Sequence, residues 1–175
     1  MKEMETGKWL LRRAEERDRQ RIWEILLQAK EQMRRQGKRQ WDEAYPSMEH
    51  VSADLARGWA HVLCDEQGGV IACGAVVYDG EPAYERLGGR WLSEAPYVVV
   101  HRLAVAEEAR HRGVALRFMQ EVERMSRERG VESFKVDTNF DNLYMLHLLE
   151  KLGFVYCGEI FYPQGQRKAF EKLLK

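Results

Sequence analysis

The sequence predicts an α/β fold of the α+β kind, in which about four helices flank a mixed, mostly antiparallel central sheet. Two β-rich runs joined by the turn sequence DEQGG predict an antiparallel hairpin over residues 59–78. A strand, a helix and a strand in succession over residues 97–138 predict one parallel pair. The chain has 175 residues, of which 45% are hydrophobic, so it can bury one core, and we expect a single domain over residues 1–175.

The N-terminal third of the sequence predicts a short strand and two helices before the hairpin. Residues 9–14, WLLRRA, are expected to form an edge strand. Apolar residues spaced three and four apart over residues 22–33 predict an amphipathic helix that Gly37 ends. Ser47 is a suitable N-cap for a second short helix that runs to Arg57.

The rest of the chain predicts further strands and helices and one long loop. The loop over residues 79–96 contains aromatic side chains, which is unusual for a passive connection and typical of a functional one. Gly130 and Gly153 are expected to end the two helices. The expected strands are 97–105, 133–138, 154–160 and 168–173, and the expected helices are 115–130 and 142–152.

Composition excludes several classes of protein. Lys plus Arg and Asp plus Glu number 28 each, so no overall charge attracts the chain to nucleic acid or to an anionic membrane. Three cysteines without CxxC spacing argue against a disulfide framework and a zinc ribbon. The charged N-terminus lacks the apolar core of a signal peptide, and no apolar run approaches the roughly 18 residues of a spanning helix. We therefore expect a cytoplasmic protein that binds neither nucleic acid nor a membrane.

The segment AEEARHRGVA, between the strand that ends at Val105 and the next helix, has the features of an anion site. Gly113 permits a backbone conformation or a close approach that other residues resist. The first turn of a helix offers N–H groups that bind phosphate oxygens, and the basic side chains of residues 110–112 add positive potential. These features predict a diphosphate site, although an ordinary capped helix explains the same residues. The glycine patterns of a P-loop and of a Rossmann turn are both missing.

The pattern R-x-x-G-x-A from Arg110 to Ala115, directly after the strand HRLAV, resembles motif A of the GCN5-related N-acetyltransferase (GNAT) family. The later stretch VDTNFDNLYMLHLLEKLGF resembles the family's second strand-and-helix unit. QW and YP near residues 41–46 and the run WLSEAPYVVVHRLAV resemble a bacterial branch of the family. The resemblance covers roughly residues 9–172. It implies a GNAT-like fold with a splayed parallel strand pair, and an acyltransferase that uses acetyl-CoA as co-substrate and no metal.

The resemblance also implies roles for residues on both sides of the coenzyme. The backbone of the motif A strand would hold the pantetheine arm and the acetyl group, and the loop after it would hold the diphosphate. Two asparagines on the opposite side would bind the pantetheine, although turn formation and helix capping explain them equally well. The strand residues are Leu103, Ala104 and Val105, and the two asparagines are Asn139 and Asn142. The loop residues are Arg110, His111, Arg112, Gly113, Val114 and Ala115.

Transfer to an amine requires a neutral nucleophile, and an alkylammonium has a pKa near ~10, so a base has to take a proton. His101 is the first candidate, because with regular alternation it faces the same side as Leu103 and Val105 and its imidazole titrates in the useful range. A half-buried histidine bonded to a backbone carbonyl is the alternative. Many family members protonate the leaving thiolate with a tyrosine at the position of Leu149. Tyr144 is the candidate replacement, although it is equally a surface aromatic.

Aromatic residues of two loops, Trp41 with Tyr45 and Tyr84 with Trp91, predict a pocket for a cationic amine, and buried loop packing explains them as well. The leading hypothesis is direct transfer of the acetyl group to a primary amine of a small molecule or peptide, in a ternary complex. A non-catalytic acyl-CoA sensor is the alternative. The sequence leaves the acceptor and the assembly open, a homodimer included.

Overall fold

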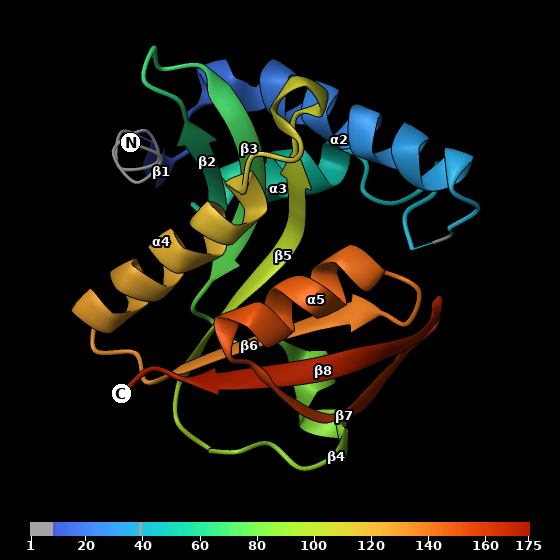
Figure 1. The fold of residues 1–175 in the computed structure, drawn as a ribbon, viewed down its shortest axis with the longest axis vertical. Coiled ribbons are helices and arrows are strands. Elements are labelled where there is room, and N and C mark those ends of the chain that lie inside the picture. Colours follow the sequence, from blue (N-terminus) through green and yellow to red (C-terminus); the bar gives the residue numbers. More distant parts are fainter. Residues whose placement is uncertain (1–8, 39) are drawn as a thin grey trace. The chain divides into compact units, whose positions relative to one another are not determined.

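The computed structural model describes residues 9–38 and 40–175 (Figure 1). The chain forms two compact units, each built from two segments of the sequence. The first unit comprises Met1–Val76 and His101–Val122, and the second comprises Val77–Val100 and Glu123–Lys175. Two strands, over residues 70–77 and 97–105, and one helix, over residues 114–128, run from one unit into the other. The expectation of a single domain over the whole chain stays a prediction.

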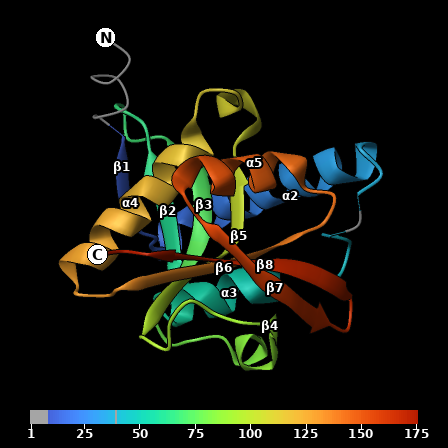
Figure 2. The same ribbon diagram turned by 60° about the horizontal axis from the view of Figure 1, so that its bottom comes forward.

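The first unit contains the N-terminal strands and helices. Its elements are β1 (Leu10–Arg13), a 3-10 helix (Glu16–Asp18), α2 (Arg19–Arg35), α3 (Met48–Ala56), β2 (Ala60–Cys64), most of β3 (Val70–Val77) and a 3-10 helix (Glu107–Ala109). Strand β2 is antiparallel to both β1 and β3, and β1 is the edge strand, as the sequence predicted. Figure 2 shows β1, β2 and β3 side by side.

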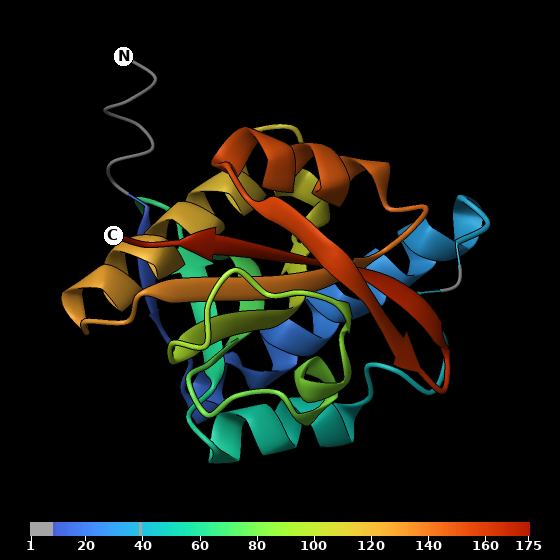
Figure 3. The ribbon, with the colours of Figure 1, turned by 90° about the horizontal axis from the view of Figure 1, so that it is seen from below.

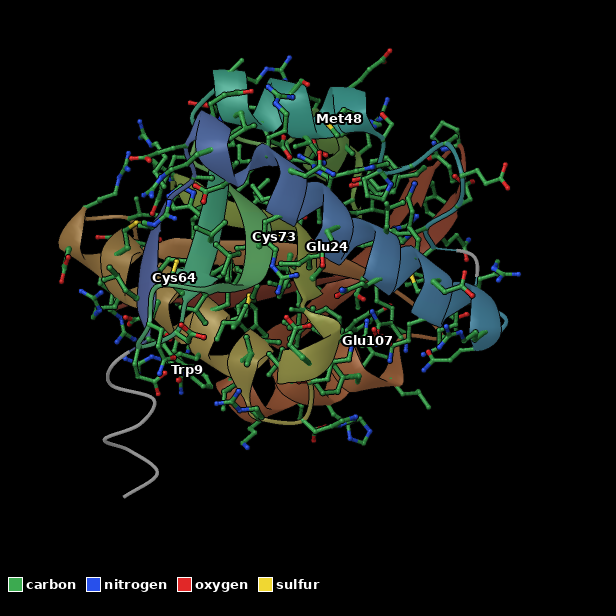
Figure 4. The ribbon with its side chains drawn as sticks, turned by 90° about the horizontal axis from the view of Figure 1, so that it is seen from above. Trp9, Glu24, Met48, Cys64, Cys73 and Glu107 are labelled. Atoms are coloured by element: carbon green, nitrogen blue, oxygen red, sulfur yellow. The ribbon has the colours of Figure 1, made fainter. Side chains whose placement is uncertain are left out.

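The two helices of this unit follow from local sequence. Helix α2 buries Ile22, Ile25, Leu26 and Ala29, which recur at steps of three and four and form its predicted apolar face. The N-cap of α3 is Ser47, as predicted, and its N–H donates to Nδ1 of His50 at 2.9 Å. In Figure 4, α2 crosses β2 and β3, which carry the labelled Cys64 and Cys73. The interior of the unit therefore lies between α2 and these strands.

The second unit contains the C-terminal strands and α5. The elements wholly or partly within it are a 3-10 helix (Pro82–Arg86), β4 (Gly88–Gly89), β5 (Tyr97–Val105), α4 (Val114–Glu128), β6 (Ser133–Asn139), α5 (Leu143–Leu152), β7 (Val155–Tyr162) and β8 (Gly165–Leu173). The hydrogen-bonded strand order is β1-β2-β3-β5-β6-β8-β7-β4. Pairs β4–β7, β6–β8 and β7–β8 are antiparallel and β5–β6 is parallel, which confirms the predicted mixed, mostly antiparallel sheet.

The parallel pair is short. Tyr97–Val99 pairs with Ser133–Lys135, although both strands continue beyond this register. Strand β6 runs on to Asn139 and pairs with β8 along its whole length. Asp137 therefore lies on the part of β6 that follows the last residue paired with β5.

The sheet of the second unit has two covered faces. Figures 1 and 3 show α5 on one side of β6, β8 and β7 and the loop of residues 79–96 on the other. Phe134 of β6 packs edge-on against Phe154, at the end of α5, with ring centres 5.0 Å apart. Since side chains alternate along a strand, Lys135 and Asp137 face the loop instead. The loop thus covers the polar face of β6.

Strand β4 was not predicted, because Gly88 and Gly89 lie within the predicted loop of residues 79–96. They pair with Glu159 and Gly158 of β7. A Cβ at Gly89 would lie 2.2 Å from the carbonyl oxygen of Cys157, so only glycine allows the two backbones to approach this closely. The glycines therefore serve strand pairing within the long loop.

Candidate active site

Helix α4 begins at a glycine of the motif A loop. The N–H of Arg117 donates to the carbonyl of Gly113 at 3.0 Å, which makes Gly113 the N-cap of α4. A glycine N-cap has no side chain to accept from the N–H groups of the first turn. A Cβ added at Gly113 would meet nothing within 4 Å, so this side of the loop is open. The start of α4 therefore offers an anion the N–H groups that its own cap leaves unpaired.

The backbone just before α4 alternates between positive and negative φ. His111 has a φ of 65° and Gly113 a φ of 75°, whereas Arg112 between them is not in the positive region. Such alternation turns successive N–H groups toward one side and forms a nest, which is a concavity that binds anions. The nest leads directly into the N-terminus of α4.

The guanidinium group of Arg110 has a buried nitrogen without a hydrogen-bond acceptor among the described residues. Its Nη2 is buried and makes no hydrogen bond with any residue that the structure describes. A buried N–H without an acceptor is costly, and an anionic oxygen would satisfy it. Val114 and Ala115 are buried and offer their backbone, and the guanidinium of Arg112 lies 5.6 Å from the centre of the Trp9 ring. The residues of this loop fit a diphosphate.

Strand β5 is interrupted just before the motif A loop, at Arg102, whose φ is 56°. Side chains alternate regularly only along extended backbone. The regular alternation that would place His101 on the same side as Leu103 and Val105 is therefore wrong. Leu103, Ala104 and Val105 follow the interruption and form the end of β5, and their contacts with the coenzyme stay predictions.

His101 is desolvated. Burial, with a smaller contribution from the charge of Arg102, lowers the pKa of His101 to about 4. The expectation that this imidazole titrates in the neutral range is therefore wrong. At pH 7 it is neutral, and a group with so low a pKa gives little driving force for proton abstraction near neutrality. Its role as general base stays a prediction.

Replacing His101 with glutamine tests this role through pH. Its folded pKa of about 4 lies below the ordinary 6.5, so the histidine favours the folded state above pH 6.5, and this contribution is lost as the pH falls toward 4. We expect His101→Gln to weaken the pH dependence of the unfolding free energy in that interval, measured by urea denaturation. The pH–rate profile of transfer should stay unchanged near neutrality. Loss of an inflection in kcat/KM would instead identify His101 as the base.

Arg102 organises a buried polar cluster in the first unit. Its guanidinium donates to both carboxylate oxygens of Asp54, at 2.8 and 2.6 Å, and to Oη of Tyr45 at 3.0 Å. Burial acts to lower the pKa of Arg102, but the hydrogen bonds to Asp54 and Tyr45 and their charge raise it overall. A cavity of about 20 Å³ beside Asp54 and Arg102 has room for a water molecule and not for an acceptor. Trp41, predicted to contact the acceptor together with Tyr45, is buried.

Tyr84 and Trp91, the other predicted acceptor contacts, pack together in the second unit. Nε1 of Trp91 donates to the carbonyl of Tyr84 at 2.9 Å, and the ring centres are 5.2 Å apart. The hydroxyl of Tyr84 donates to Oδ2 of Asp137 at 2.7 Å. Nζ of Lys135 lies 4.4 Å from the centre of the Trp91 ring and 4.2 Å from that of Tyr97. The aromatic side chains of the loop and of β5 therefore pack against polar side chains of β6.

The buried carboxylate of Glu171, on β8, ties the same loop to the sheet. Its Oε1 accepts from the N–H of Leu92 at 2.6 Å, and its Oε2 accepts from the hydroxyls of Ser93 and Ser133 at 2.7 Å each. Glu171 is 0% exposed. Both residues 92 and 93 donate to this one buried carboxyl group, so this part of the loop is anchored to β8.

Asn139 and Asn142 lie in the turn between β6 and α5. Nδ2 of Asn139 donates to Asp141 at 2.7 Å, and Oδ1 of Asn142 accepts from the N–H of Met145 at 3.2 Å as the N-cap of α5. These bonds belong to turn formation and capping, the alternative that the sequence left open. Contacts of the two asparagines with pantetheine stay predictions.

Tyr144 and Leu149 occupy different environments on α5. Tyr144 is 60% exposed, whereas Leu149 is 0% exposed and part of the core. The position of the usual tyrosine therefore holds a packed apolar side chain. The role of Tyr144 as general acid stays a prediction.

Sequence reasoning missed Asp137 and the Asp54–Arg102 pair. In SFKVDT, charged and apolar residues alternate, which predicts one buried and one solvated face of a strand. The signal against a solvated face was the length and aromatic content of residues 79–96, which cover it. The Asp54–Arg102 pair has no such signal, because its members are distant in sequence.

Residues 9–38 and 40–175 contain neither a metal site nor a membrane-spanning helix. No group of three or more His, Cys, Asp or Glu side chains there is arranged to hold a metal ion. No helix within those ranges has the length and apolar character needed to cross a bilayer.

Comparisons with known proteins agree with this geometry. Residues 19–154 match the model of the acetyltransferase (GNAT) family. No curated protein matches the chain in sequence. A GNAT-family acetyltransferase from Streptococcus agalactiae 2603 is 29% identical, with a TM-score of 0.87 over 95% of this chain and 96% of that chain.

Two more distant structures share the fold. A protein from Salmonella typhimurium, solved with its cofactor acetyl-CoA, is 14% identical with a TM-score of 0.67 over 96% of this chain and 95% of that chain. An agmatine N-acetyltransferase is 19% identical with a TM-score of 0.67 over 95% and 100%. The family match covers most of the chain and includes the motif A loop. The chain belongs to the GNAT family and is an acetyltransferase whose acetyl donor is acetyl-CoA.

Proposed function

We propose that the protein transfers the acetyl group of acetyl-CoA directly to a primary amine while both substrates are bound. The motif A loop carries the donor half of this proposal. Its nest, its glycine N-cap at the start of α4 and the unsatisfied Nη2 of Arg110 together suit the two phosphates of the coenzyme. The coenzyme supplies the acetyl group as a thioester.

The chemistry of the cysteines supports direct transfer. A covalent acetyl-enzyme would need an accessible thiolate. Cys64, Cys73 and Cys157 are all buried, and burial raises the pKa of each thiol, that of Cys73 to about 12. None of them is suited to accept the acetyl group, so attack by the bound amine is the simpler route.

The acceptor side favours a cationic amine. A relative of the same fold acts on agmatine, a cationic amine. In this chain the loop of residues 79–96 brings Tyr84, whose ring packs against Trp91, into hydrogen-bond contact with the carboxylate of Asp137. Aromatic rings and a carboxylate are the groups that attract an ammonium ion. We therefore propose a primary amine that is protonated in solution, carried by a small molecule or a peptide.

A screen for acceptors tests this function. We expect calorimetry to show micromolar binding of acetyl-CoA, and thiol release above background with at least one amine from a panel of polyamines, aminoglycosides, amino acids and peptides with free N-termini. Mass spectrometry of the product should show one added acetyl group.

Three outcomes would contradict the proposal in different ways. Lack of acetyl-CoA binding at micromolar concentration would overturn the assignment of the motif A loop as the donor site. Binding without thiol release across the whole panel would favour a non-catalytic acyl-CoA sensor. S-acetylation of the protein itself would overturn direct transfer.

A further inference from the structure

Two tyrosine hydroxyls hold one oxygen of Asp137. Oη of Tyr84 donates to Oδ2 of Asp137 at 2.7 Å, and Oη of Tyr162 donates to the same oxygen at 3.1 Å. Tyr84 comes from the loop of residues 79–96 and Tyr162 from the end of β7. The carboxylate is therefore fixed in orientation by two side chains that are far apart in sequence.

The other oxygen of Asp137 is available. Within the part of the chain that the structure describes, Oδ1 accepts no hydrogen bond and Asp137 forms no ion pair. Oδ1 also has some contact with solvent, because Asp137 is only partly buried and this oxygen is not a fully buried atom. Burial raises the pKa of Asp137, although the bonds from Tyr84 and Tyr162 and the charge of Arg167 act against this. In these partly buried surroundings, Oδ1 of Asp137 is free to accept a hydrogen bond from a cation.

Two cations near Asp137 lie against aromatic rings and form no ion pair with it. Lys135, on the same face of β6, directs its Nζ to the rings of Trp91 and Tyr97. The guanidinium of Arg167 lies 5.6 Å from the centre of the Tyr162 ring. On β8, the residue directly opposite Asp137 is Ala169, whose side chain is small. Within residues 9–38 and 40–175, no ammonium or guanidinium group forms an ion pair with Asp137, and its direct neighbour on β8 is small.

We propose that Asp137 binds the ammonium group of the acceptor, with Oδ1 accepting its N–H and with Tyr84 and Tyr162 holding the carboxylate in place. The inference rests on the proposed function and narrows the acceptor to amines that bind as cations. A carboxylate that only joined two tyrosines would need one accepting oxygen, and an asparagine would supply it without a buried charge. The open Oδ1 is what a purely structural role leaves unexplained.

The decisive variant is Asp137→Asn. The amide oxygen can still accept from both tyrosines, while the amide NH2 replaces Oδ1 and presents a donor to the ammonium. Because burial disfavours the charged form of Asp137, this variant should be at least as stable to heat as the wild type. We expect KM for the amine to rise about 10- to 100-fold, with the dissociation constant of acetyl-CoA within about twofold of the wild-type value.

Two matched amines sharpen the measurement. The probes are 1,4-diaminobutane and 4-amino-1-butanol, together with the best acceptor of the screen. A rise in KM for all probes supports binding of the reacting ammonium, and a rise for the diamine alone supports binding of its second ammonium. Either result supports the inference, because in both cases Asp137 binds an ammonium group of the acceptor.

Two further variants accompany Asp137→Asn: Glu159→Gln is the control, and Tyr162→Phe tests whether Tyr162 positions the carboxylate. Glu159→Gln removes the same charge from β7. Glu159 pairs with Lys168 of β8, whose side chain points to the opposite face from that of Ala169, the partner of Asp137. Glu159 therefore lies on the other face of the sheet, and KM should not change. Tyr162→Phe removes one of the two donors and should raise KM about threefold with kcat nearly unchanged, as a positioning residue would. A KM for Asp137→Asn within twofold of the wild type, in an enzyme that acetylates the probe, would overturn the inference. A wild-type enzyme inactive with every amine would instead overturn the proposed function.

Discussion

Replacing Gly113 with valine is expected to weaken acetyl-CoA binding about 100-fold or more. The φ of Gly113 is 75°, a conformation that a β-branched residue strongly disfavours. The loop of Gly113→Val should relax toward negative φ, which turns the N–H groups of the nest away from a common centre. Losing two or more hydrogen bonds to charged phosphate oxygens, at about 1.5–3 kcal/mol each, accounts for this loss. Isothermal calorimetry with acetyl-CoA measures it.

The opposite end of α4 supplies a matched control. Gly130 has a φ of 76°, and a Cβ there would also meet nothing within 4 Å. Gly130→Val therefore introduces the same backbone strain, which costs about 1–3 kcal/mol of stability, without touching the nest. We expect both valine variants to lose similar stability and only Gly113→Val to lose affinity. Equal affinities in the two variants would contradict the role of the motif A loop.

Replacing Asp54 with asparagine is expected to lower the unfolding free energy by about 3–5 kcal/mol. Asp54 and Arg102 have side chains that are only 11% and 13% exposed and are joined by two hydrogen bonds. The variant leaves the guanidinium of Arg102 buried without its counter-charge, which is the costly situation for an ion pair in the interior. Urea denaturation at neutral pH, followed by circular dichroism, measures the change.

Two further variants separate this effect from a general loss of charge. Glu128→Gln removes an exposed partner of Arg124 on α4, and we expect little measurable change, because exposed ion pairs contribute little. The double variant Asp54→Leu with Arg102→Met removes both buried charges and should recover most of the stability lost by Asp54→Asn. A double variant as unstable as Asp54→Asn would show that the pair does more than compensate its own burial.

Much of the architecture could be predicted because the relevant signals are local. The hairpin turn DEQGG, the glycines that end helices and the N-cap Ser47 each act within a few residues, and the structure contains all of them. Gly113 is also local, so the start of α4 could be found from the loop sequence alone. Local chemistry of this kind is independent of how the rest of the chain packs.

The parts of the site that the sequence did not reveal depend on distant contacts. The prediction for His101 assumed regular alternation along β5, but Arg102 has a positive φ that nothing in the sequence signals. The side chain of Arg102 bonds to Asp54, which lies 48 positions earlier in the sequence. Likewise, Asp137 reads as a residue of a solvated face. It becomes a desolvated carboxylate because Tyr84, 53 positions earlier, covers it. Tertiary packing decides both environments, and periodicity contains no record of it.

The three hydrogen bonds to Glu171 have a consequence for how substrate range can change. Two of them, from Leu92 and Ser93, fasten the loop next to Trp91, and the third comes from Ser133 of β6. The loop is thus ordered before any acceptor arrives, and little conformational entropy has to be lost on binding. Its aromatic side chains can be exchanged while the attachment point stays in place. Under the proposed function, acceptor preference can therefore change through side chains of this loop while the sheet stays the same.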